Sequence, residues 1–134
     1  MVTRCYEDST CEMGVILGTG TNACYIENLS LINKYKGSTP KGSGGMIINM
    51  EWGAFGDSKS FLPSTKYDKS LDTNSLNPSF QLFEKMISGM YLGEIARYAL
   101  LDLHKSGSLF NGISVPILND PYAFQSAYLT DIQK

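Results

Sequence analysis

The sequence predicts an α+β chain in which antiparallel strands pack against one long helix. Short runs of branched apolar residues, bounded by glycines and polar residues, indicate strands in the first part of the chain. Residues 77–105 carry apolar side chains on more than one face, which is typical of a largely buried helix. At 134 residues the chain is one modest domain or a piece of one, and it is long enough to bury a real core.

The strand pattern recurs four times. The runs are residues 13–17, 23–27, 29–33 and 46–51, of which the third alternates only in part. The first run holds Val15, Ile16 and Leu17 in succession, which suits a strand covered on both faces. An antiparallel meander is the simplest arrangement of these runs.

Two stretches are predicted to be loops. Residues 35–45 contain two lysines, Pro40 and several glycines, a composition typical of a flexible loop tip. Residues 58–77 are rich in Ser, Thr, Asp and Asn, with few apolar side chains, and we expect a long surface connection. Such a connection either helps to shape a cleft or only joins two elements.

The long helix has clear start and stop signals. Asn77 is expected as the N-cap and Pro78 as the first helical residue. The helix should run to about residue 105, with Gly107 past its end. The single histidine, His104, would lie near the C-terminal end, where an imidazolium suits the helix dipole. A last amphipathic helix is expected over residues 122–134, started by Asp120 and Pro121.

Gly89 and Gly93 interrupt the long helix, at a cost of up to ~1 kcal/mol each relative to alanine. Such a cost indicates either close packing or a close ligand. The sequence leaves both explanations open for each glycine.

Composition excludes several functions. A net charge of −2 and a pI near 5.3 argue against a nucleic-acid surface. No apolar run approaches the ~20 residues of a membrane span, and no signal peptide is indicated at the start. The three cysteines are odd in number and form no C-x-x-C pair, which favours reduced thiols in a cytoplasmic protein. With one histidine, a His-rich metal site is excluded.

The glycine turn after the first strand is the first candidate site. Gly18 and Gly20 have no Cβ to keep a ligand away, and Thr19 and Thr21 add hydroxyl groups. Such a turn can present backbone N–H groups to an anion, usually a phosphate. A plain glycine hairpin turn is the alternative. It is not a Walker A loop, because no lysine follows the second glycine.

Three motifs, in this order along the chain, resemble those of the hexokinases, the eukaryotic sugar kinases that include glucokinase. The phosphate-turn motif GTG-x-N-A-C-Y is found at residues 18–25, and the sugar motif N-x-E-W-G-A-F-G-D at residues 49–57. The third motif, E-K-M-I-S-G-M-Y-L-G-E, is found at residues 84–94. The resemblance covers nearly the whole chain and is weakest at residues 34–45 and after Gly112. It implies part of a large α/β lobe of the ribonuclease-H-like, actin-like type, as a single partial domain over residues 1–134.

The resemblance also implies the roles of site residues. An ionised carboxylate can accept hydrogen bonds from several sugar hydroxyls, and Glu51 ends a strand while Glu84 lies near a helix N-terminus. The family match assigns sugar contacts to Asn22, Glu51 and Glu84. It assigns ATP-phosphate or nucleotide contacts to Gly18, Thr19, Gly20 and Gly89.

The activity that the resemblance implies is phosphorylation of glucose or a related hexose at its 6-hydroxyl by ATP with Mg²⁺, the first step of glycolysis. The family's catalytic base is an aspartate, and no aspartate in this chain matches its motif, so no catalytic or metal-ligating residue is expected here. We expect that aspartate just before Met1, in the remainder of the hexokinase chain, and no turnover from these 134 residues alone. A non-catalytic sugar sensor or regulatory relative is the alternative.

Overall fold

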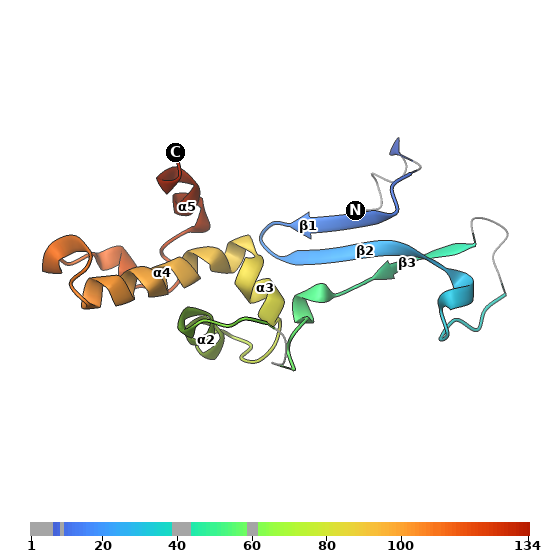
Figure 1. Cartoon of the computed structure of the whole chain (residues 1–134), viewed down its shortest axis with the longest axis horizontal. Coiled ribbons are helices and arrows are strands. Elements are labelled where there is room, and N and C mark those ends of the chain that lie inside the picture. Colours follow the sequence, from blue (N-terminus) through green and yellow to red (C-terminus); the bar gives the residue numbers. More distant parts are fainter. Residues whose placement is uncertain (1–6, 9, 39–43, 59–61) are drawn as a thin grey trace. The chain divides into compact units, whose positions relative to one another are not determined.

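The computed structural model describes residues 7–8, 10–38, 44–58 and 62–134 (Figure 1). The chain forms two compact units. The first comprises Met1–Ile16 and Asn22–Glu51, and the second comprises Leu17–Thr21 and Trp52–Lys134. The chain contains antiparallel strands and helices, as expected, but several of their bounds differ from the prediction. The packing of the sheet on the long helix and the single partial domain stay predictions.

The first unit is built on a three-stranded antiparallel sheet with the order β1-β2-β3 (Figure 1). Its strands are β1 (Met13–Leu17), β2 (Thr21–Asn28) and β3 (Gly45–Asn49). In the register of β2 with β3, Cys24 lies opposite Asn49 and Ile26 opposite Ile47. Three of the four predicted strands are therefore confirmed, and β1 has the predicted bounds.

The prediction that both faces of β1 are buried is wrong for this chain. Val15 and Ile16 are each 47% exposed, and Leu17 is 69% exposed. The strand lies at an edge of the sheet with only β2 beside it, and the described residues leave its apolar side chains partly open to solvent.

The predicted strand at residues 29–33 is also wrong. Leu29–Leu31 form a 3₁₀ helix, because the Asn28 side chain accepts hydrogen bonds from the backbone N–H and the hydroxyl of Ser30, both at 2.9 Å. Local side-chain bonds of this kind compete with strand pairing. Of the predicted loop tip, residues 39–43 lie outside the described residues, as do Cys5 and the chain start at residues 1–6.

The second unit is helical (Figure 1). Its α-helices are α2 (Lys66–Thr73), α3 (Leu82–Ile87), α4 (Gly89–Lys105) and α5 (Ser126–Ile132). Short 3₁₀ helices are formed by Trp52–Ala54, Phe110–Gly112 and Pro116–Leu118. None of the helices in the described ranges is long and apolar enough to cross a membrane.

The predicted single helix over residues 77–105 is divided into α3 and α4. Ser88 breaks it with an extended backbone, φ −88° and ψ 153°. Its start at Asn77 and Pro78 is wrong, because Asn77 instead accepts a turn hydrogen bond from the Phe80 N–H at 3.2 Å. The predicted end at Lys105 is confirmed, and Gly107 follows with φ +74°.

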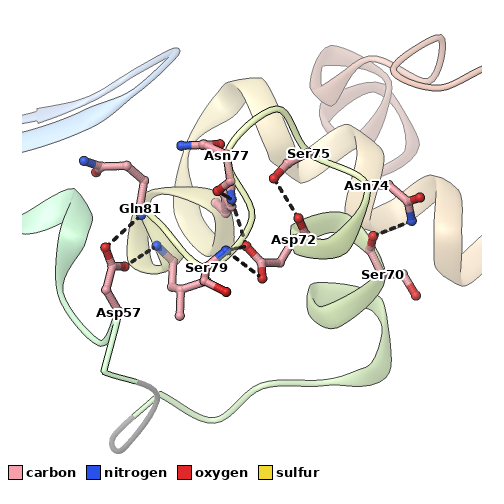
Figure 2. Close-up of polar contacts among 10 residues, drawn as sticks. Asp57, Ser70, Asp72, Asn74, Ser75, Asn77, Ser79 and Gln81 are labelled. Atoms are coloured by element: carbon pink, nitrogen blue, oxygen red, sulfur yellow. Dashed lines mark hydrogen bonds and ion pairs between the residues drawn. The ribbon is translucent and has the colours of Figure 1, made fainter.

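Helix α2 falls within residues 58–77, where the sequence analysis expects only a connection. Thr65 and Asp68 form a capping box, a helix-start signal that was missed among so many polar residues. Asp72 near the helix end forms an ion pair with the buried Lys85 at 2.8 Å and accepts from the Ser79 N–H at 2.9 Å (Figure 2). These bonds tie α2 to α3 and fix the intervening loop. Part of the predicted connection, residues 59–61, lies outside the described residues.

Helix α4 buries charge rather than only apolar side chains. Its buried residues are Gly93, Glu94 and Arg97. Arg97 donates to Glu94 and to the Leu118 carbonyl, while Glu94 accepts from the Tyr122 N–H at 2.7 Å. The bond to Glu94 raises the pKa of Arg97, so the guanidinium stays charged. This ion pair fixes the chain that leads into α5.

The last helix, α5, begins later than predicted, at Ser126 instead of Asp120 and Pro121. Tyr122 has a left-handed backbone, φ +59°, which a helix starting there would not allow. Gly93 faces this segment, and a β-carbon there would overlap the Phe124 carbonyl. Close packing therefore explains Gly93.

Candidate functional site

The glycine turn joins β1 to β2 and belongs to the second unit. Its Gly18 N–H donates to the Gly20 carbonyl at 3.0 Å. The N–H groups of Thr19 and Gly20 and the Thr19 hydroxyl have no acceptor among the residues that the structure describes. A β-carbon at Gly18 would meet no atom of the described residues within 4 Å, so they leave this side of the turn open. The turn thus offers donors of the kind that bind an anion.

The opposite side of the turn holds the start of α4. The carbonyls of Gly18 and Thr19 accept from the N–H groups of Gly89 and Met90, at 2.7 and 3.1 Å. A β-carbon at Gly89 would lie 3.0 Å from the Gly18 oxygen, which is tighter than ordinary packing. Packing against the turn therefore accounts for Gly89, and its contact with a nucleotide stays a prediction.

Glu84 lies near a helix N-terminus, as predicted, but in the first turn of a helix that begins at Leu82 and not at Pro78. Its Oε2 atom accepts from the Thr21 N–H at 2.9 Å, and the Thr21 hydroxyl accepts from the Trp52 indole N–H at 2.9 Å. The Trp52 ring packs edge-on against Phe83, with centroids 5.8 Å apart. The sugar-binding candidate is thus bonded directly to the phosphate-turn candidate.

The charge of Glu84 also affects the pKa of Tyr91 in α4. Burial raises the pKa of Tyr91, and the negative charge of Glu84 raises it further. The Tyr91 phenol therefore keeps its proton near neutral pH.

Asp57 caps the helix that carries Glu84. Its two carboxylate oxygens accept from the backbone N–H groups of Leu82 and Gln81, at 2.9 and 3.1 Å (Figure 2). A carboxylate at a helix N-terminus satisfies free N–H groups and favours the helix dipole. No local pattern could reveal this role, because Asp57 is 25 residues from Leu82 in the chain.

Removal of this cap should loosen α3. We expect Asp57→Ala to lower the stability of the full-length protein by about 1 kcal/mol, the usual loss for a helix cap. Asp57→Asn, which keeps one carbonyl oxygen as an acceptor, should lose less. Thermal melting checks both variants, and an Asp57→Ala protein that melts like wild type would contradict the capping role.

The first unit holds a second cluster of polar side chains at the end of β3. Glu51 Oε1 accepts from the side-chain amides of Asn49 and of Asn22, the latter at 3.2 Å. Asn22 also donates to Asn49 Oδ1 at 2.9 Å. The backbone of Glu51 is left-handed, φ +49°, which is uncommon for glutamate and recurs at functional sites. Asn49 is a member of this cluster that the sequence analysis did not single out, although it begins the sugar motif.

The structure therefore brings the predicted site residues together in two groups. Asn22 and Glu51 meet in the first unit, and in the second unit the turn is bonded to both Glu84 and Gly89. The expectation that Glu51 and Glu84 face one cleft stays a prediction, as do the individual sugar and phosphate contacts. Within the described ranges, no group of three or more His, Cys, Asp or Glu residues could hold a metal ion.

The turn with open N–H groups and the carboxylate of α3 bonded to it form a candidate site for a sugar and a phosphate. Comparison with known proteins assigns the chain to a protein family. The family model described as Hexokinase matches residues 12–134. The chain belongs to the hexokinase family, and its fold is part of the family's actin-like fold.

The similar proteins carry hexokinase names. The chain is 50% identical over 134 residues to Hexokinase-3 of Homo sapiens and 47% identical over 135 residues to Hexokinase-1 of Homo sapiens. These matches cover 99% and 100% of this chain but only 14% of each relative. A solved hexokinase from Schistosoma mansoni, complexed with glucose, matches with a TM-score of 0.87 and 41% identity, over 98% of this chain and 29% of that one.

Proposed function

We propose that this chain is a portion of an ATP-dependent hexokinase that transfers the γ-phosphoryl group of ATP to the 6-hydroxyl of glucose or a related hexose. The observation that carries the proposal is the hydrogen bond of Glu84 to the turn whose Thr19 and Gly20 N–H groups are open. A sugar carboxylate and a phosphate turn must lie side by side for such a transfer. The glucose complex of the Schistosoma mansoni relative supports the same substrate class.

Hexose recognition would use Asn22, Glu51 and Glu84. A hexose has several hydroxyl groups and no charge, so its recognition needs fixed acceptors. Glu51 is held by two amides and Glu84 by a backbone N–H, which limits the directions in which each carboxylate can accept. A site of this kind rejects an analogue that lacks one hydroxyl, because an acceptor is then left unpaired.

Phosphate binding would use the Gly18–Gly20 turn. The open N–H groups of Thr19 and Gly20 and the Thr19 hydroxyl fit phosphate oxygens, and none of the described residues fills the space beside Gly18. Magnesium bound with the nucleotide would neutralise charge on the transferred group. Mg²⁺ usually takes substrate phosphates and water as ligands, so we propose that it enters with ATP.

A coupled assay for glucose 6-phosphate on the full-length protein, with ATP, Mg²⁺ and glucose, tests the proposal. Turnover that depends on all three would support it. Glucose binding without phosphorylation would overturn it in favour of the alternative, a non-catalytic sugar sensor.

The role of the turn can be separated from that of the sugar residues. Thr19→Val removes the hydroxyl but keeps the side-chain shape, so it should weaken turnover and raise the KM for ATP while glucose affinity stays nearly intact. Thr19→Ser, which keeps the hydroxyl, is the matched control. Loss of glucose affinity with unchanged ATP kinetics would show that the roles are wrongly assigned.

A further inference from the structure

Two hydrogen bonds connect the Glu84 carboxylate through Thr21 to Trp52, and we call them the positioning relay. Glu84 Oε2 accepts from the Thr21 N–H, and the Thr21 hydroxyl accepts from the Trp52 indole, both at 2.9 Å. Thr21 is only 6% exposed, so these bonds are shielded from water. We infer that Thr21 and Trp52 are positioning residues that aim the Glu84 carboxylate at the sugar and thereby couple the sugar site to the phosphate turn. This inference rests on the proposed function.

The two oxygens of the Glu84 carboxylate differ in their hydrogen bonds, and this difference supports the positioning role. Oε2 is occupied by the turn, whereas Oε1 accepts no hydrogen bond from the part of the chain that the structure describes. One oxygen therefore anchors the side chain, and the other is left for a sugar hydroxyl. Because Thr21 follows Gly20 directly, any shift of the turn moves the anchor of the sugar carboxylate.

The two glycines of the turn differ in what surrounds them. A β-carbon at Gly20 would lie 2.7 Å from Glu84 Oε2, too close for both to keep their places. A β-carbon at Gly18 would meet nothing within 4 Å. Neither glycine has a positive φ, so alanine is tolerated by the backbone at both. Gly20 thus clears space for the carboxylate, a role that belongs to the sugar site although the residue lies in the phosphate turn.

The test is glucose binding to the full-length protein by titration calorimetry without ATP, with kcat and the KM for ATP measured separately. Gly20→Ala should raise the Kd for glucose by about tenfold or more, the effect of losing a well-placed bond to a charged group. Gly18→Ala is the comparison in the same turn: its Kd for glucose should rise far less than that of Gly20→Ala, because a β-carbon at Gly18 has room among the described residues. Glu12→Ala, at an exposed residue outside the candidate site, is the control that should bind glucose like wild type. If Gly20→Ala does not fold, the next pair of variants decides.

Trp52→Phe keeps a ring against Phe83 and removes the indole N–H, while Thr21→Val removes the hydroxyl acceptor. Both should raise the Kd for glucose severalfold without changing the melting temperature. The double variant should be no worse than either single variant, because both remove the same bond. Thr21→Ser, which keeps the hydroxyl, should restore wild-type affinity.

Glu84→Gln distinguishes the two ways in which the account can fail. If Glu84→Gln leaves the Kd for glucose unchanged, the proposed sugar role fails, and the inference fails with it. If Glu84→Gln weakens glucose binding but Gly20→Ala, Trp52→Phe and Thr21→Val do not, the sugar role stands and the positioning relay is overturned.

Discussion

Replacing Glu51 or Glu84 with alanine in the full-length protein should lower kcat/KM for glucose by about a hundredfold or more. Each carboxylate accepts hydrogen bonds from its surroundings. In the proposed sugar-binding role, its removal would leave sugar hydroxyls without a charged acceptor. Loss of such charged hydrogen bonds to the bound sugar should cost at least roughly 3 kcal/mol of transition-state stabilisation. Steady-state kinetics with saturating ATP measure the effect.

A third carboxylate provides the matched control for these variants. Glu12 is exposed and lies in the first unit just before β1. Glu12→Ala removes the same chemical group away from the candidate site, so kcat/KM should not change. Near-wild-type kcat/KM for glucose in either Glu51→Ala or Glu84→Ala would refute the sugar assignment for that residue.

The second large effect concerns stability. Arg97→Leu should destabilise the full-length protein by roughly 3–5 kcal/mol, the usual cost of leaving one partner of a buried ion pair uncompensated. Glu94 is 2% exposed and Arg97 4%, so the remaining carboxylate would be buried without its counter-charge. The Leu118 carbonyl would lose its donor as well. Thermal melting, or the rate of thermal inactivation where melting is irreversible, measures the loss.

The control for Arg97→Leu is a variant of an exposed ion pair that also involves a residue of α4. Lys66 bonds to Asp102 of α4 at 2.6 Å, but their side chains are 67% and 48% exposed. Surface pairs of this kind contribute little, because both charges stay hydrated. Lys66→Ala should therefore melt close to wild type, and an Arg97→Leu protein as stable as Lys66→Ala would contradict the structural role of the buried pair.

The elements that the sequence predicted correctly have local signals. Branched apolar residues ended by a glycine predicted β1 with the bounds found, and Gly107 marked the end of α4. The position of Glu84 near a helix N-terminus was also predicted. The start of that helix was not, because it is set by Asp57 from a distant part of the chain and not by Asn77 and Pro78 beside it.

Much of what could not be predicted depends on contacts between distant residues, although the capping box of α2 is a local signal that was missed. The break at Ser88 coincides with bonds from the start of α4 to the carbonyls of Gly18 and Thr19. The bond of Thr21 to Glu84 spans 63 residues of sequence. Motif resemblance assigned both stretches to one site, but only the structure shows that the turn and the carboxylate are bonded to each other.

A crystal structure of the full-length protein with glucose and a non-hydrolysable ATP analogue tests the central claim most directly. The account predicts that oxygens of Glu51 and Glu84 accept hydrogen bonds, at about 2.5–3.0 Å, from hydroxyls of one sugar. It also predicts that the N–H groups of Thr19 and Gly20 point to phosphate oxygens. A sugar bound with either carboxylate beyond about 3.5 Å of every hydroxyl would contradict the account.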